Sequence, residues 1–306
     1  MSGPTRPSLF ALAAIGSKTG AQSPSRLYHP PQASSARRHA KRPPSLPVEA
    51  PPVPLTPWEQ LLEPLMGVHI SGVVAVIAAV PGIAAYGLRH VLPLPASVVL
   101  WHIAGTGMLV AAAATEALAG RTTWIMGKRA DGTINPVHFT LLWPYHVGLR
   151  AKLALQRRLS SEPSFSQVTD EYFIGAWPSE MALVPTVHPA VLDVTCELPL
   201  QVVPPAYLNL AVWDTHAPTA QQIETGVQWA LAQRAVGRPV LVHCAHGHGR
   251  SATVLAAILI AEGKAKGASD AEALMKASRP RVRLNTRQRA ALKQWIALRE
   301  GTGKLE

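Results

Sequence analysis

Cysteine and charge are both scarce in this chain of 306 residues. The two cysteines, Cys196 and Cys244, are too few for a framework of disulfides, and a reactive free thiol is typical of a reducing compartment. Charged residues make up 15% of the chain and aromatic residues 6%, and no basic patch has interleaved aromatic side chains. We therefore expect no nucleic-acid partner, and the absence of zinc-ligand spacing predicts no metal site.

Acidic residues are missing altogether from residues 1–48, which are rich in Ser, Ala, Pro and Arg. Such a segment cannot bury a core and is typical of a plastid or mitochondrial transit peptide; an ordinary disordered basic tail is the alternative. The formal net charge is +11, with 12 basic and 5 acidic residues in 1–150 against 17 and 13 in 151–306. This excess of positive charge in the first half favours targeting and contact with a membrane surface.

Two apolar runs, residues 65–88 and 95–119, are each long enough to span a bilayer as a helix. Small residues dominate both runs, and a short link with Arg89 and His90 joins them. Basic residues flank the pair on both outer sides, so the positive-inside rule places both flanks on one face of the membrane. The sequence predicts a transmembrane hairpin, with a buried hairpin of a soluble protein as the alternative. The following residues, 134–158, predict an interfacial amphipathic segment or a soluble linker helix.

The stretch 239–263 has the pattern of a strand, a glycine-rich loop and a buried helix. Residues 240–242 form a short apolar, β-branched run, as expected of a buried strand. The apolar run from Ser251 to Ile260 is too long for a strand here and predicts a helix. Loop N–H groups and the helix dipole both point at whatever occupies such a loop, which makes it a cradle for an anion.

This loop holds the groups that a phosphate-transfer site needs. A thiolate at Cys244 would be stabilised by the loop N–H groups and would be nucleophilic at neutral pH. The planar guanidinium of Arg250 can bind two phosphate oxygens, and Ser251 places a hydroxyl near the sulfur. We expect catalysis from Cys244, Arg250 and Ser251, and substrate binding by the rest of the loop: His243, Ala245, His246, Gly247, His248 and Gly249.

The order His-Cys-x5-Arg-Ser at residues 243–251 resembles the signature of the cysteine-dependent protein tyrosine phosphatase superfamily, and within it the dual-specificity branch. Members of this superfamily use an aspartate about thirty residues before the cysteine as a general acid. Asp214, in the stretch from Trp213 to Pro218, has that position and is the expected acid. The loop lacks the Trp-Pro-Asp order of receptor-type tyrosine phosphatases, which favours the dual-specificity branch. A structural strand cysteine and a turn or capping aspartate are the alternatives.

The resemblance covers about residues 165–298 and implies an α/β fold with a mostly parallel central sheet flanked by helices. The predicted elements around the loop are strand 168–175, a unit at 187–194 with strand 190–195, strand 207–212, helix 219–235, helix 270–278 and a last helix through Trp295. The predicted organisation is a disordered basic region at 1–60, two transmembrane helices at 61–120, an interfacial linker at 121–160 and a phosphatase domain at 161–306.

The mechanism that the resemblance implies has two steps and needs no metal and no cofactor. Cys244 attacks phosphorus while Asp214 protonates the leaving oxygen, and Asp214 then activates the water that hydrolyses the phosphocysteine. Retention of both residues together with Arg250 argues against a catalytically inactive phospho-binding module.

The expected partners are a phosphoprotein or phospholipid substrate and a membrane. Lipid-acting relatives usually carry a lysine after the cysteine, whereas Ala245 and His246 follow it here, and histidine supplies at most partial charge near neutral pH. The sequence therefore favours a phosphoprotein substrate, with phosphotyrosine as the main target and phosphoserine or phosphothreonine as further targets. The hairpin favours the alternative, a lipid such as phosphatidylglycerophosphate. We expect the membrane to be that of a plastid or mitochondrion, with the phosphatase domain on the reducing side.

Cys196 ends a predicted strand that should neighbour the strand of Cys244. Several superfamily members pair an oxidised nucleophile with a second cysteine at about this place, so Cys196 is a candidate redox partner. A small buried side chain with only a packing role is the alternative.

Overall fold

The structure, a computed structural model, describes residues 70–302. The predicted basic region at 1–60, with its transit peptide, lies outside these residues, as do the first five residues of the apolar run that was predicted to begin at residue 65.

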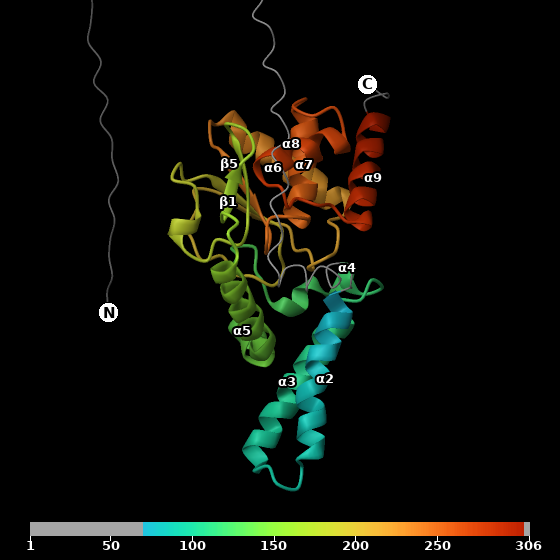
Figure 1. Ribbon diagram of the computed structural model, residues 1–306. Coiled ribbons are helices and arrows are strands. Elements are labelled where there is room, and N and C mark those ends of the chain that lie inside the picture. Colours follow the sequence, from blue (N-terminus) through green and yellow to red (C-terminus); the bar gives the residue numbers. More distant parts are fainter. Residues whose placement is uncertain (1–69, 303–306) are drawn as a thin grey trace, which may run out of the picture. The chain divides into compact units, whose positions relative to one another are not determined.

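Two apolar helices, α2 (Ile70–Gly87) and α3 (Leu94–Ala113), pack side by side as a hairpin (Figure 1). Small residues bring them close, because a Cβ added at Gly107 would lie 2.4 Å from the Cβ of Ala78. Both helices are long and apolar enough to cross a membrane. The predicted second run was too long at its end, since α3 stops at Ala113 and a turn follows.

The centre of the fold is a five-stranded sheet with the strand order β1-β2-β5-β3-β4. Four strands run parallel, and only β1 pairs antiparallel, with β2. The bounds are β1 Phe165–Gln167, β2 Tyr172–Gly175, β3 Ala190–Asp193, β4 Tyr207–Asn209 and β5 Val240–His243. The predicted mostly parallel sheet is confirmed, as is the pairing of the Cys196 and Cys244 strands, although most strands are shorter than predicted.

The register brings functional positions to one edge of the sheet. His243, the last residue of β5, pairs with Gly175 on β2 and with Asp193 on β3. Because all three strands are parallel, their carboxyl ends meet at this edge, and the loops that follow them lie together. Cys244 and Glu197 both belong to such loops.

Four helices, shown together in Figure 1, complete this half of the fold: α6 Ala220–Ala235, α7 Arg250–Ala261, α8 Ala268–Ser278 and α9 Thr286–Thr302. Helix α7 is buried from Arg250 to Leu259, which explains why its sequence is apolar on every side. Helix α6 begins with a capping box formed by Thr219 and Gln222, one residue after the predicted start. A short 3-10 helix, η3 (Met181–Leu183), precedes β3.

The segment between the hairpin and the sheet is helical and packs against the sheet domain. It contains α4 (Ala119–Thr122), the 3-10 helix η2 (Thr123–Met126) and α5 (Pro136–Leu159). Helix α5 is kinked at Leu142, close to Pro144, because proline blocks the normal backbone hydrogen bond. Two buried clusters join the segment to the sheet domain: one contains Met126, Leu142, Cys196 and Trp213, the other Leu153, Trp177, Leu198 and Ala245. The predicted linker thus supplies part of the core.

Candidate active site

The loop after β5 wraps around the sulfur of Cys244. The backbone N–H of Gly247 donates a hydrogen bond to this sulfur at 3.2 Å, and the Ser251 hydroxyl donates another at 3.4 Å. Gly247 has φ +78°, and a Cβ there would lie 2.5 Å from the backbone of Gly175, so only glycine allows the loop to pass β2. The loop therefore presents its donors inward to the thiol.

The environment of Cys244 favours its thiolate. The side chain is buried, and burial by itself raises the pKa of a thiol. The Arg250 guanidinium, the Ser251 hydroxyl and the backbone N–H groups of Ser251 and His246 outweigh burial, so the pKa of Cys244 lies below its usual value. A lowered thiol pKa is what a cysteine nucleophile requires at neutral pH.

Arg250 opens α7 and is held by three oxygen-bearing groups. Its Nη1 and Nη2 donate to the two carboxylate oxygens of Glu197 at 3.1 and 2.8 Å, and Nη1 also donates to the Val212 carbonyl at 2.7 Å. Nη2 lies 3.0 Å from Oδ1 of Asp214. The fork is therefore pre-oriented beside Cys244, and an incoming phosphate would compete with Asp214 for it.

Glu197 is a candidate site residue that the sequence reasoning missed. Its side chain is 1% exposed, and it binds Arg250 through both oxygens. A buried carboxylate of this kind needs a cation, and removing Glu197 would leave the buried guanidinium with Asp214 as its remaining carboxylate partner. The available signal was an acidic residue among apolar ones just after a buried parallel strand.

Asp214 lies in the turn between β4 and α6, with its side chain 29% exposed. Burial would raise the pKa of this carboxyl, but Arg250, His246 and Lys152 together hold it below its usual value. The backbone N–H of Thr215 donates to the Asp214 carboxylate at 3.0 Å, and the Trp213 ring nitrogen donates to the Thr122 hydroxyl at 3.2 Å. The predicted acid thus lies beside Arg250, in a loop that touches the segment following α3.

Side chains outside the loop hold the rest of the loop in place through the His246 carbonyl and the His248 ring. Arg279 donates to the His246 carbonyl at 2.8 Å and lies 3.2 Å from Glu162, and the Glu162 carboxylate also lies 2.7 Å from Nε2 of His248. His248 in turn stacks on the His246 ring, with the centroids 6.0 Å apart. Burial is the main reason that the pKa of His246 falls to about 4, so this ring is neutral at physiological pH.

The stretch after α8 fixes the loop and the acid turn together. Gln288 lies against Gly249, where an added Cβ would approach its amide to 2.9 Å. The same amide donates to the His216 carbonyl at 3.1 Å, and Asn285 donates to the Thr215 carbonyl at 2.8 Å. The loop at residues 244–249, which we call the catalytic loop after its proposed role, and the Asp214 turn are thereby held in one arrangement.

Helix α5 forms a wall of the site, which the sequence reasoning did not foresee. Leu149 and Leu153 pack with Trp177, Leu198 and Ala245. Arg157 donates to the Trp177 carbonyl at 2.6 Å and to the Ser179 hydroxyl at 2.7 Å. Lys152 is exposed one residue before Leu153, and its charge acts on both Asp214 and His246.

Cys196 is buried three residues beyond the end of β3. Its thiol donates to Glu197 at 3.5 Å, and burial raises its pKa well above the usual value. It packs with Trp213 and with side chains of the hairpin and linker segment. The redox role of Cys196 stays a prediction.

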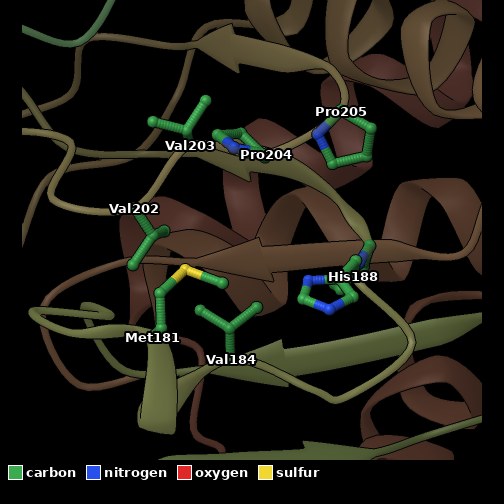
Figure 2. A pocket seen from close by; sticks show the side chains of 8 residues that line it. Met181, Val184, His188, Val202, Val203, Pro204 and Pro205 are labelled. Carbon is green, nitrogen blue, oxygen red and sulfur yellow. The ribbon is translucent and has the colours of Figure 1, made fainter.

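The pocket shown in Figure 2 lies outside this site. It is lined by residues around η3 and before β4: Met181, Val184, His188, Pro189, Val202, Val203, Pro204 and Pro205. None of the predicted site residues belongs to it. Among residues 70–302 no group of three or more His, Cys, Asp or Glu side chains is placed to hold a metal ion.

Comparison with known proteins gives a family match in the part of the chain that contains Cys244 and Asp214. Residues 197–299 match the family described as "Swiss Army Knife protein, DSP-PTPase phosphatase domain". A segment of 54 residues, 17% of this chain, is 48% identical to mouse "Phosphatidylglycerophosphatase and protein-tyrosine phosphatase 1" and 46% identical to the human protein of that name. The matches span only 28% and 27% of these relatives.

Solved structures of similar chains were also found. "Crystal Structure of PTPMT1 in complex with PI(5)P" is 24% identical, with a TM-score of 0.40 over 47% of this chain and 99% of that chain. Human DUSP28 is 23% identical, with a TM-score of 0.40 over 45% of this chain and 97% of that chain.

Proposed function

We propose that the chain is a membrane-anchored hydrolase of phosphoric monoesters and that its substrate is a phospholipid monoester at the bilayer surface, because residues 197–299 match a phosphatase domain of the dual-specificity type. The predicted resemblance to the cysteine-dependent phosphatases is confirmed by this domain. The membrane anchor and the substrate class are the parts that the proposal adds.

The position of the acid turn is the observation that carries the lipid assignment. Helix α3 ends at Ala113, and Thr122, nine residues later in the chain, accepts the hydrogen bond of Trp213 beside Asp214. Glu116 pairs with Arg287 at the start of α9, 2.7 Å apart. If α3 spans the bilayer, the site lies within a few residues of its surface, where a lipid headgroup is presented.

Lys152 supports the same assignment. The loop carries Ala245 and a neutral His246 where lipid-acting relatives usually carry a lysine. Helix α5 brings an exposed ammonium to that side of the loop instead. A cation at the rim attracts the second negative charge of a phospholipid that bears both a phosphomonoester and a phosphodiester.

The chemistry follows from the contacts around Cys244. The thiolate attacks phosphorus, the bond from phosphorus to the leaving oxygen breaks, and protonated Asp214 gives its proton to that oxygen. Arg250 and the loop N–H groups hold the phosphoryl oxygens through this step. Water then attacks the phosphocysteine, Asp214 takes its proton, and the Ser251 hydroxyl stabilises the departing thiolate. Inorganic phosphate leaves.

Phosphotyrosine in proteins is the second candidate, because Cys244 is followed by Ala245 and a neutral His246 rather than by a lysine. The name of the curated relatives, which joins a phosphatidylglycerophosphatase to a protein-tyrosine phosphatase, is compatible with either substrate. Membrane anchoring in a mitochondrion or plastid, with the catalytic half on the reducing side, belongs to the same proposal.

The test compares two substrates on full-length protein in phosphatidylcholine vesicles. Phosphate release is measured from phosphatidylglycerophosphate in those vesicles and from a soluble phosphotyrosine peptide, each with and without EDTA. We expect kcat/KM to be higher for the lipid by at least about tenfold, a difference of about 1.4 kcal/mol in transition-state stabilisation. EDTA should leave both rates unchanged.

The control is Cys244→Ser, which should abolish hydrolysis but keep phosphate-ester binding, because Arg250 and the backbone remain. Turnover of the peptide alone would replace the lipid assignment with the protein one. Binding of both substrates without turnover by the wild type would make the chain a phospho-binding module.

A further inference from the structure

A lysine from the segment after the hairpin is buried at the carboxyl end of β3. Lys128 follows η2, and its side chain is 1% exposed. Its ammonium forms an ion pair with Oδ2 of Asp193 and donates to the Thr195 hydroxyl at 2.9 Å and to the Thr195 carbonyl at 3.1 Å. The turn that delivers it needs Gly127, which has φ +69° and no room for a Cβ beside His138.

The Asp193 side chain contacts residues from the stretch after β3, from β4 and from β5. Its side chain is fully buried at the end of β3. It accepts hydrogen bonds from the backbone N–H and hydroxyl of Thr195 at 2.9 and 2.7 Å, and from the Tyr207 hydroxyl on β4 at 2.9 Å. Its Oδ2 also lies 3.6 Å from Nε2 of His243, the residue before the nucleophile.

His243 connects Asp193 to the catalytic loop. Its Nδ1 lies 3.3 Å from the Cys244 carbonyl, and the tautomer that carries the ring proton on Nδ1 donates a hydrogen bond there. Burial lowers the pKa of His243, so the ring is neutral and Nε2 carries a lone pair. In this tautomer that lone pair faces a carboxylate oxygen, and the Lys128 ammonium and the Tyr207 hydroxyl, which both bind the same oxygen, offset the repulsion.

We propose that Lys128 is a positioning residue for the reaction: its ammonium neutralises Asp193, which holds the neutral His243 ring against the Cys244 carbonyl and so sets the loop around the sulfur. The inference rests on the proposed catalytic role of that loop. It makes the segment after the membrane hairpin part of the active-site framework, although that segment lies outside the matched residues 197–299.

Loss of the ammonium has a defined chemical consequence. Asp193 would be an uncompensated buried carboxylate, and either it or His243 would take up a proton. A proton between these two groups changes the hydrogen bonding of the His243 ring, and the Cys244 carbonyl loses its fixed donor. The loop N–H groups then hold the sulfur less well, which favours the thiol over the thiolate.

The experiment measures the pKa of the Cys244 thiol in full-length protein in detergent micelles, from the pH dependence of its alkylation by iodoacetamide. Buried Cys196, with its raised pKa, is replaced by Ser in every sample so that one thiol reacts. Lys128→Met should raise the apparent pKa of Cys244 by about one unit, a tenfold slower reaction below that pKa. The double variant Lys128→Met, Asp193→Asn, which removes both charges, should return it to within about 0.3 units of the parent.

Lys264→Met is the matched control, because Lys264 pairs with Glu171 and Glu262 away from the loop. It should leave the thiol pKa unchanged. The other charged or titratable groups that face Cys244 or its Arg250 partner are the same in all samples: Glu197, Asp214, His246, Arg250 and Arg279.

An unchanged thiol pKa in folded Lys128→Met protein would overturn the proposal and leave Lys128 as a stabilising ion pair only. So would a double variant whose thiol pKa stays as high as that of Lys128→Met. If Lys128→Met does not fold, the double variant decides alone, since its thiol pKa must equal the parent value. Alkylation requires no substrate, so a wrong substrate assignment would not affect this result.

Discussion

The general-acid role that we propose for Asp214 has to agree with the low pKa of its carboxyl group in the unliganded site. A general acid must be protonated when the leaving oxygen departs, yet Arg250 keeps the pKa of this carboxyl low in the unliganded site. A phosphate dianion on Arg250 would remove that cation from Asp214 and add negative charge beside it. Both effects raise the pKa of Asp214, so substrate binding itself supplies the protonated acid.

Replacement of Asp214 by alanine tests this role. We expect Asp214→Ala to lower kcat by about 10²- to 10⁴-fold for a phenyl or alkyl phosphate, because the leaving oxygen then departs without a proton. For an ester whose leaving group needs no proton, the loss should be much smaller. Initial rates on the two esters measure the difference.

The pH profile adds a second readout with a defined sign. The thiolate of Cys244 is lost as pH falls through its lowered pKa, so the acid limb of kcat/KM should remain in Asp214→Ala. The alkaline limb of kcat, which follows loss of the Asp214 proton in the complex, should vanish. Equal losses on both esters, or an unchanged alkaline limb, would remove Asp214 from the acid role.

Among the helices and strands, α5 is the one whose position in the structure differs most from what its sequence pattern predicted. An amphipathic segment beside two apolar helices indicates an interfacial linker. In the structure one side of α5 packs against the catalytic loop through Leu153, and its other contacts reach α3, where Trp143 stacks on His102 with the ring centroids 6.4 Å apart. The helix therefore connects the hairpin to the active site.

Two leucines on α5, one buried and one exposed, allow the packing of this helix to be tested by substitution. Leu153 is 6% exposed, whereas Leu155 is 58% exposed on the same helix. Leu153→Ala should lower the free energy of unfolding by about 2–5 kcal/mol, because it opens a cavity beside Trp177 and Ala245. Leu155→Ala should change it by less than about 0.5 kcal/mol.

Thermal and denaturant unfolding of the full-length variants in detergent gives both values. If α5 is only a surface linker, the two substitutions will have equally small effects. The catalytic loop should also respond, so that Leu153→Ala lowers kcat/KM while Leu155→Ala does not.

For the whole molecule, the question is whether the hairpin holds the chain in a bilayer. Helices α2 and α3 expose many large apolar side chains, among them Val76, Ile77, Val80 and Ile83 on α2, which in water would be costly but in lipid would not. The full-length chain should therefore stay with membranes after carbonate washing. Sedimentation followed by immunodetection measures this.

A chain that begins at Leu118 is the control. It lacks the hairpin but keeps Lys128 and α5, so it should be released by the wash and should still hydrolyse a soluble phosphate ester. Release of the full-length chain by salt alone would mean attachment to the surface without spanning helices.

The sequence by itself determined the parts that depend on neighbouring residues. A β-branched run, a loop with two glycines and an apolar helix stand together in residues 239–263, so the strand, cradle and helix around Cys244 could be predicted from local propensity and spacing. The alternation of strands and helices likewise predicted the parallel sheet. The strand ends were less predictable, because a strand ends where its neighbour in the sheet stops pairing with it, as at Asn209 rather than Val212.

Only the tertiary structure decided which buried charges meet. Lys128 and Asp193 are 65 residues apart, and Glu197 and Arg250 are 53 apart. No periodicity links such pairs; they arise because the carboxyl ends of parallel strands converge and because burial leaves each charge no solvent to bind. The same long-range packing placed α5 against the loop. A segment that its composition marks as a linker thereby became a wall of the active site.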